Sequence, residues 1–439
     1  MENEVEWHPS SEGSTSSSED PKHNCKGSVN SNIIWNETPE FVTQVDNGLL
    51  YKVGSQNTTV NLLHVYGTPY QMGYAHGQLL KEQMNVMYPQ FLSYAEEAIG
   101  KNLPAFINIL PDFIIKMIED FGVNFALDYI ALVTKPYTAA EFYEELKGLS
   151  DGSGLDYQMI IRLHMFPELV KAHCSILGAW GEATPNGGLI QLRALDWGLD
   201  NPLVSVPTFI VYHPEAGNGH VFSILSWSGY IGALTGYSQR VGVSQKVWIK
   251  YNGTYSYEGI PFYFNLRNML QYDTSIDEVL NRIYNTQRTC SIFLGVGSNE
   301  SSQAVVVEYS HDVVRVFDDD TPFPGYAPQS PEHPFFNDIV YVDKHTQPNS
   351  DPCMPSLISE YYGQINAQAL INLVAQFQTG DLHAAIYDFE ANTVYISVAS
   401  TFQPSLWPLP NPKSITAAYE NQWIQLDMNT LFSTSNPGL

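Results

Sequence analysis

The pattern of apolar and polar positions divides the chain into two parts with different periods. From about Val60 to Val170, apolar residues recur at helical spacings. After residue 173, short β-branched and aromatic runs bounded by Gly, Pro and Asn replace this pattern and predict strands. These runs are residues 189–195, 208–213, 220–227, 304–309, 313–317, 384–389 and 393–398. Helical patterns between them lie near 262–270, 276–286 and 368–376.

Local signals predict where the early helices begin and end. Thr68 followed by Pro69 is typical of an N-cap and first helical position. The segment 138–141 (TAAE) predicts a capping box, and Gly148 a helix end, before a loop at 151–154. A further amphipathic helix is expected from about Tyr157 to His173.

Residues 1–32 are rich in Ser and Glu and predict a disordered tail, because they carry too little apolar surface to fold. A helical first third and a strand-rich remainder with interspersed helices predict an α+β fold of packed layers rather than a βαβ array. The change of period falls beside Cys174.

Composition is that of a globular protein with an unusual charge. The 439 residues are 44% hydrophobic, and 20 Lys and Arg against 46 Asp and Glu give a net charge of −26. Such a chain has no general attraction to nucleic acid or anionic membranes. Its apolar runs are too short for a membrane-spanning helix, and its first residues lack the basic and apolar regions of a signal peptide.

Standard motifs exclude several enzyme classes. No G-x-S-x-G, Walker, G-x-G-x-x-G, H-E-x-x-H or EF-hand pattern occurs. The histidines are scattered and the cysteines form no C-x-x-C pair, so we expect neither a metal nor another cofactor. N-glycosylation sequons would suit a secreted glycoprotein, although about four are expected by chance. They lie at Asn36, Asn57, Asn252 and Asn299.

One segment combines a cysteine with a predicted hairpin. A strand-like run starts at Cys174, a turn follows at 184–188 (TPNGG), and a second strand runs to Asp196 and Trp197. Because a hairpin folds its second strand back along the first, Arg193 and Asp196 are expected to return to the neighbourhood of Cys174.

This arrangement resembles the cysteine-type N-terminal-nucleophile (Ntn) hydrolases, the group of acid ceramidase, N-acylethanolamine amidase, bile-salt hydrolase and isopenicillin-N acyltransferase. Segments 67–82 and 144–160 resemble the propeptide motifs of the acyltransferase and acid-ceramidase-like branch. Segments 232–244 and 379–400 resemble its later strand pairs. The resemblance spans roughly residues 60–400.

The resemblance implies a four-layer αββα sandwich and a self-cleaving chain. Residues 33–173 would form a helical segment that stays packed on a catalytic domain, residues 174–439, after cleavage between His173 and Cys174. The freed α-amine of Cys174 would act as base for its own thiol. Asp196 would orient that amine, and Arg193 would favour the thiolate.

Two family positions differ here, so the oxyanion-hole groups stay open. Ser238 stands where relatives carry an Asn, and Lys344–His345 best matches the later Asn-His. Purely structural roles for the three candidate residues also remain open. Cys174 can be a small buried hydrophobe, and Arg193 with Asp196 a structural ion pair.

The remaining cysteines and two tryptophans have simpler readings. Cys290 reads as a buried thiol, and Cys25 and Cys353 can pair. Trp180 and Trp197 read as core or pocket-wall residues.

The expected reaction is hydrolysis of a linear N-acyl amide, favouring a lipid amide of ceramide or N-acylethanolamine type. The alternatives are an acyltransferase, a penicillin-acylase-like amidase or a catalytically silent lipid-binding relative. The charge favours a lysosomal or secreted location. At pH near ~5, protonation of all 12 His would bring −26 to −14 and reduce self-repulsion.

Overall fold

The computed structural model describes residues 25–55, 58–106, 110–170, 172–323, 325–326, 330, 332–401 and 415–438, without the side chains of 100–106 and 401. The predicted disordered tail, residues 1–32, therefore lies outside the described residues up to position 24. Residues 25–32 are described, and a disulfide between Cys25 and Cys353 fixes them to the body. Asn30 adds hydrogen bonds to the carbonyl oxygens of Tyr419 and Asn421.

Three strands and six helices precede Cys174 in the described residues. They are β1 (Glu40–Val45), β2 (Gly48–Val53), β3 (Val60–Gly67), α1 (Pro69–Leu79), α2 (Lys81–Phe106), α3 (Asp112–Phe121), α4 (Val123–Thr134), α5 (Ala140–Ser153) and α6 (Tyr157–Met165).

The rest of the chain mixes strands and helices, as its sequence pattern predicts. The strands are β4 (His173–Gly181), β5 (Gly187–Asp196), β6 (Pro207–Pro214), β7 (Phe222–Trp227), β8 (Thr235–Tyr237), β9 (Val241–Val247), β10 (Ser291–Ser298), β11 (Gln303–Ser310), β12 (Val314–Phe317), β13 (Ile339–Val342), β14 (His383–Asp388), β15 (Thr393–Val398), β16 (Ser400–Thr401), β17 (Ile415–Thr416) and β18 (Ile424–Asp427). The helices are α7 (Phe262–Tyr272), α8 (Ile276–Asn285), α9 (Cys353–Tyr361), α10 (Ala367–Phe377) and α11 (Met428–Ser433).

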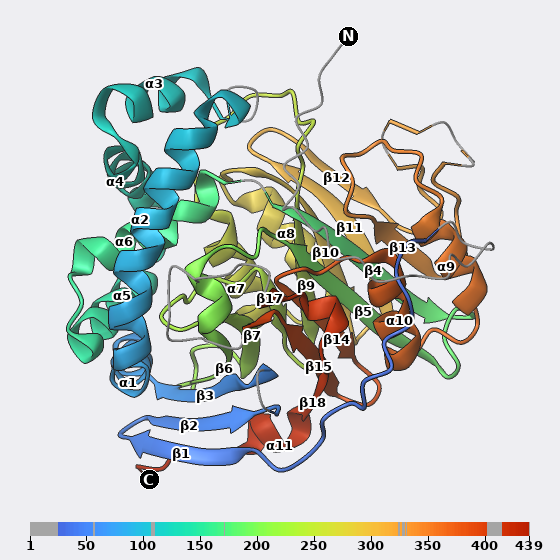
Figure 1. The fold of residues 1–439 in the computed structure, drawn as a ribbon, viewed down its shortest axis with the longest axis horizontal. Helices are drawn as coiled ribbons and strands as arrows, with labels where there is room; N and C mark the ends of the chain where they lie inside the picture. Colours follow the sequence, from blue (N-terminus) through green and yellow to red (C-terminus); the bar gives the residue numbers. More distant parts are fainter. Residues whose placement is uncertain are drawn as a thin grey trace.

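Two large sheets pack face to face between layers of helices (Figure 1). One has the order β1-β2-β3-β6-β7-β8-β9-β10-β11-β12, and the other β13-β4-β5-β14-β15-β18. Ile176 of β4 packs between the sheets with Phe293, whereas the next residue, Leu177, packs on the opposite face with Leu370 of α10. The outer face of the ten-stranded sheet packs against α1, α2 and α7. The predicted α+β, four-layer αββα fold is confirmed.

The N-terminal segment is less helical than its pattern predicts. Val60–Gly67 is strand β3, not helix, and β1 and β2 precede it. Strand β3 pairs in parallel with β6. The segment before Cys174 therefore extends the ten-stranded sheet as well as covering it.

Of two helix starts predicted from local signals, one is confirmed and the other is wrong. Thr68 caps α1 as predicted, with a capping box to Gln71. The predicted box at 138–141 is wrong, because the N-cap is Ala139, and α5 continues through Gly148 to end at left-handed Gly154. A Cβ on Gly148 would lie 2.2 Å from the carbonyl oxygen of Tyr70. Gly148 thus allows close contact between the backbones of α1 and α5, which belong to the two propeptide-like motifs.

The predicted helix from Tyr157 to His173 is also too long. Helix α6 ends at Met165, a 3₁₀ turn follows at Phe166–Glu168, and His173 already belongs to β4.

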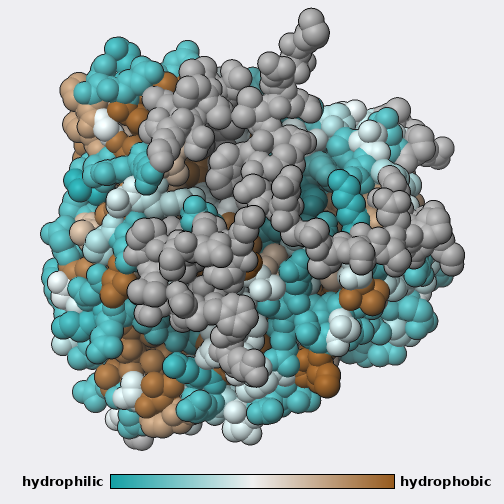
Figure 2. Space-filling model, viewed as in Figure 1, coloured by the Kyte–Doolittle hydropathy of each residue, from teal (hydrophilic) through white to brown (hydrophobic). Residues whose placement is uncertain are grey.

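The outer surface is largely hydrophilic, with separate apolar patches (Figure 2). One patch lies at the end of the molecule where Figure 1 places α3 and α4. Phe121 and Leu132 are exposed on these two helices. In the described part of the chain, no helix has the length and apolar character needed to span a membrane.

Candidate active site

The predicted hairpin is confirmed and fixes the site. Strands β4 and β5 pair so that His173 faces Asp196, Cys174 faces Leu195 and Ile176 faces Arg193. Gly187, where β5 begins, has a φ of +80°, which glycine adopts without strain. The chain thereby returns both predicted partners to the start of β4.

Arg193 lies directly beside the candidate nucleophile. Its Nη2 is 3.6 Å from Cys174 Sγ, and both side chains are fully buried. Its Nη1 donates to His383 Nε2 at 2.8 Å, and its Nε to the Gln245 carbonyl oxygen at 3.4 Å. Since a guanidinium only donates, the accepting His383 Nε2 carries no proton.

The charges around Cys174 oppose the effect of burial. Burial raises the pKa of the Cys174 thiol, whereas Arg193 and then Lys246 lower it. The thiol is therefore neutral at rest, and the two cations favour its ionised form.

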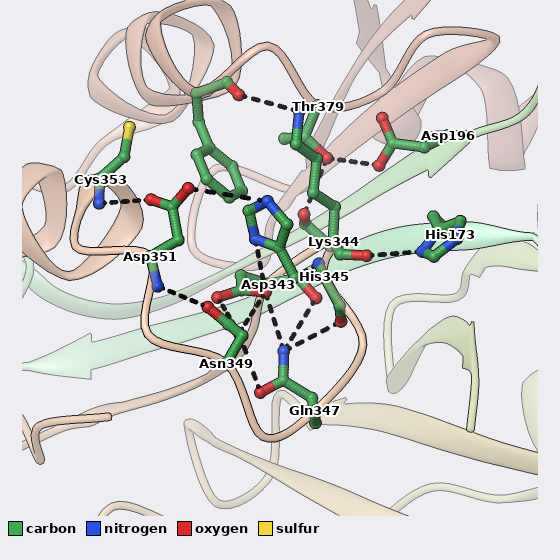
Figure 3. Close-up of polar contacts among 12 residues, drawn as sticks. His173, Asp196, Asp343, Lys344, His345, Gln347, Asn349, Asp351, Cys353 and Thr379 are labelled. Atoms are coloured by element: carbon green, nitrogen blue, oxygen red, sulfur yellow. Dashed lines mark hydrogen bonds and ion pairs between the residues drawn. The ribbon is translucent and has the colours of Figure 1, made fainter. Parts of the chain in front are cut away.

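Asp196 is held by the chain after α10 rather than by Arg193. Its Oδ2 accepts a hydrogen bond from Thr379 Oγ1 at 2.7 Å, and its Oδ1 accepts one from the Gly380 amide at 2.7 Å. Figure 3 shows the Thr379 hydroxyl directed at this carboxylate. Among the described residues, Arg193 and Asp196 form no ion pair, so the structural ion-pair reading is wrong.

The residue before Cys174 is tied to the loop after β13. The His173 Nδ1–H donates to the Lys344 carbonyl oxygen at 3.0 Å, and Lys344 Nζ in turn donates to the Gln378 carbonyl oxygen at 2.7 Å. Asn349 Nδ2 fixes the same loop by donating to Asp343 Oδ2 at 2.8 Å (Figure 3).

The two positions matched to oxyanion groups do not lie together. Ser238 is buried in the turn between β8 and β9, where its hydroxyl oxygen accepts from the Val241 amide at 3.0 Å. That turn lies beside Asn299, at the opposite end of β9 from Gln245. His345 lies between Asp343 and Asp351, at 3.4 Å and 3.6 Å. In the described part of the chain, neither side chain hydrogen-bonds Cys174 Sγ, whose partner is Arg193.

Sequence reasoning missed four polar groups of the site: His383, Thr235, Thr379 and Lys246. Thr235 Oγ1 is 2.9 Å from His383 Nε2, and Ser175 Oγ is 2.7 Å from Thr379 Oγ1. His383 and Thr379 fall inside a segment that carries the resemblance, but only the sheet pairing brings them to Arg193 and Asp196. Lys246 lies outside both the runs that predict strands and the segments that carry the resemblance, so no local signal marked it.

An apolar cavity lies near Cys174, lined by its strand partner Leu195 but not by Cys174 itself. It offers about 60 Å³ to the centre of a water-sized sphere, which is room for several waters. Its walls come from both sides of residue 173 and include Phe91, Leu163, Phe166, Ala172, Leu195, Trp197, Trp227, Tyr230, Leu234 and Leu382. Leu195 pairs with Cys174 across the hairpin, and Trp227 lies with its ring centroid 5.5 Å from that of His383.

The remaining predicted residues are placed as follows. Asn36, Asn252 and Asn299 are exposed, and Asn57 lies outside the described residues. Trp180 is buried in the core and Trp197 lines the cavity, as expected. Cys290 is a buried thiol, as predicted, and the pairing of Cys25 with Cys353 is confirmed. Within the described ranges, no three His, Cys, Asp or Glu side chains are grouped to hold a metal ion.

Comparison with solved structures gives two distant matches of low identity. An N-acylethanolamine-hydrolyzing acid amidase ortholog from Caenorhabditis elegans aligns over 58% of this chain and 100% of that chain, at 14% identity and a TM-score of 0.37. Penicillin V acylase from Agrobacterium tumefaciens aligns over 51% of this chain and 83% of that one, at 12% identity and a TM-score of 0.36. No family model matches the sequence.

Comparison with curated sequences gives both near and distant relatives. Acid ceramidase from Rattus norvegicus is 26% identical over 188 residues, which cover 38% of this chain and 46% of that protein. Protein dcd1A from Dictyostelium discoideum is 48% identical over 93% of this chain and 94% of its own length. Protein dcd1B from the same organism is 58% identical over 92% of this chain and 81% of its own length. The chain therefore belongs to the family of proteins dcd1A and dcd1B.

Proposed function

We propose that this chain is a self-processing cysteine amidase that hydrolyses linear N-acyl amides with an apolar acyl group, of ceramide or N-acylethanolamine type. The observation that carries the proposal is the buried contact between Arg193 and Cys174. Cys174 lies at the start of a strand and near an apolar cavity. The partial similarity to acid ceramidase supports the same class of reaction.

The first step is cleavage of the chain itself. Cys174 Sγ bonds to the carbonyl carbon of His173, the bond from that carbon to the Cys174 nitrogen breaks, and the thiol proton ends on that nitrogen. Water then hydrolyses the thioester, which leaves a carboxylate on His173 and restores the thiol. Cys174 now carries a free α-amine, which has an unperturbed pKa near ~7.7–8.0 and can act as base for the thiol.

Asp196 and Arg193 have separate roles in the amidase reaction. The Asp196 carboxylate, fixed by Thr379 and the Gly380 amide, lies opposite the residue before Cys174 and can hold the new ammonium group. Arg193 stabilises negative charge on Cys174 Sγ. The thiolate attacks the substrate carbonyl, the amine departs with a proton, and water releases the acid.

The cavity supports an apolar acyl group as the substrate part next to Cys174. Nearly all its lining side chains are aliphatic or aromatic, so burying a hydrocarbon there is favourable by about 25 cal/mol per Å² of apolar surface. Part of the wall comes from just before the proposed cleavage point and consists of Phe166, Pro167, Val170 and Ala172. Both fragments would therefore contact the substrate.

A disulfide would join the two fragments after cleavage. Cys25 belongs to residues 1–173 and Cys353 to residues 174–439. Disulfides persist in oxidising compartments, which supports the proposed lysosomal or secreted location.

Self-cleavage is tested first. The chain is incubated from pH 4 to 8, run on reducing gels and sequenced from new N-termini. We expect a new terminus at Cys174. Cys174→Ala should stay intact, whereas Cys290→Ala, which removes the other buried thiol, should cleave like the parent. An intact parent chain at every pH, indistinguishable from Cys174→Ala, would refute the mechanism.

The substrate class is tested next with fluorogenic ceramide, N-acylethanolamine, bile-salt and penicillin V amides. Turnover of the first two, dependent on Cys174, supports the proposal. Turnover of only the last two would assign a different amidase, and saturable lipid binding without turnover would assign a lipid-binding relative. Transfer of the acyl group to an added amine faster than to water would assign an acyltransferase.

A further inference from the structure

Lys246 is a fully buried cation that forms no ion pair with the described residues. It lies near the end of β9 with 1% of its surface exposed. Its Nζ donates to the Lys344 carbonyl oxygen at 3.2 Å. Burying an ammonium group without an ion-pair partner costs several kcal/mol, so packing alone gives no reason for a lysine at this position.

Lys246 lies beside the bond that self-cleavage would break. The Lys344 carbonyl oxygen accepts hydrogen bonds from both Lys246 Nζ and His173 Nδ1. Lys246 and His173 are thus joined through one atom, and Cys174 is the next residue. The same face of β9 carries Ser244 two residues earlier, which receives a hydrogen bond from Gln191 at 2.9 Å.

The ionisable groups that act on Lys246 belong to the proposed cleavage site or lie next to it. Burial lowers the pKa of Lys246, and the groups that oppose this effect are Cys174, then Asp343 and Asp196. The positive charge of Lys246 in turn lowers the pKa of Cys174. Arg193 also lowers the pKa of the Cys174 thiol, and it does so from β5, in the sheet that faces β9.

We propose that Lys246 is a positioning residue for self-cleavage, whose ammonium group stabilises the negative charge that forms on Cys174 Sγ. This inference rests on the proposed function, because it requires the chain to cleave itself. In the uncleaved chain Cys174 has no free α-amine, so stabilisation of the thiolate depends on fixed cations. Lys246 keeps its protons throughout, while the thiol proton passes to the Cys174 nitrogen as the peptide bond breaks.

The test measures how the rate of self-cleavage depends on pH. The full chain is made by cell-free translation, shifted to buffers from pH 4 to 9, and followed as fragment 174–439 on reducing gels. The variants are Lys246→Met, which removes the charge, Lys246→Arg, which keeps it, and Ser244→Ala, which removes an uncharged polar group from the same face of β9. Lys246→Gln replaces Lys246→Met if the latter does not fold.

We expect Lys246→Met to shift the pH profile upward by about one unit, a rate about tenfold lower on the acidic limb. Lys246→Arg should restore the profile at least in part, and Ser244→Ala should overlay the parent. A Lys246→Met profile equal to the parent's would overturn the proposal. If Lys246→Arg cleaves as slowly as Lys246→Met, the proposal is also overturned, because Lys246 would then act as a proton acceptor or through packing. A parent chain that never cleaves would instead refute the proposed function.

Discussion

Two buried histidines of the N-terminal segment hold the loop between β7 and β8. His76 Nε2 accepts a hydrogen bond from the Gly229 amide at 2.9 Å, and His164 Nε2 accepts one from the Ile231 amide at 3.1 Å. Tyr230, between these two residues, lines the cavity near Cys174. Protonation of either histidine would remove an acceptor, so we predict that the protein loses stability as the pH falls from 7 to 5.

The magnitude follows from the pKa values. Burial, and secondarily the charges nearby, lowers the pKa of His76 to about 3; burial lowers that of His164 to about 4. An unfolded histidine titrates near ~6.5, so the folded state excludes a proton that the unfolded state binds. The stabilisation is complete above the unfolded pKa and is lost as the pH falls toward the folded values. At pH 5 the loss is about 2 kcal/mol for each histidine, or about 4 for both.

Urea unfolding at pH 7 and pH 5 measures this loss. The Cys174→Ala background keeps the chain intact at both pH values. His76→Gln and His164→Gln retain an acceptor oxygen but do not titrate, so each should reduce the pH-dependent loss by about 2 kcal/mol. His311→Gln, at a histidine in a surface loop, is the control and should change nothing. If the two buried-site variants lose as much stability as the parent, the reasoning is wrong.

Three further predictions test the site and the fold. Arg193→Met should slow self-cleavage at least about tenfold, and Arg193→Lys should be faster than Arg193→Met, because the variants differ in the charge beside the nucleophile. Gly148→Ala should destabilise the chain by about 1–3 kcal/mol in urea unfolding, since its methyl group would meet the backbone of α1; Glu144→Ala, on the exposed face of the same helix, should cost less. A cleaved sample should give two bands on a reducing gel and one on a non-reducing gel, because Cys25 and Cys353 lie on different fragments.

Local sequence signals were sufficient for the hairpin. Its turn needs residues that tolerate positive φ, so the return of Arg193 and Asp196 toward Cys174 follows from the turn alone. The same reasoning found α1, where Thr68 caps the first turn. Most strands after Cys174 were predictable for the same reason.

Features set by distant packing were not predictable. Strand β3 is buried on both faces, so Val60–Gly67 shows no alternation and reads as part of the following helix. Gly148 reads as a helix end, because only the approach of α1 explains a glycine inside α5. Thr379 and Lys246 reach the site from strands and loops far along the chain, so their roles depend on how the two sheets pack.

The structure changes how the net charge of −26 is expected to vary with pH. The shift to −14 at pH near ~5 requires all 12 histidines to bind protons, but burial lowers the pKa of His64 to about 3 and of His213 to about 4, as it does for His76 and His164. These four stay neutral in the folded protein at pH 5 and oppose folding there.

Asp381 acts in the opposite direction, because burial and then Asp196 raise its pKa to about 7. Its contribution to stability is complete below the unfolded pKa near ~3.8 and is lost as the pH rises through 7. Acid stability therefore depends on buried titratable groups as well as on net charge. Asp381→Asn removes a contribution that offsets the histidines, so it should increase the loss of stability between pH 7 and pH 5 in the same urea experiment.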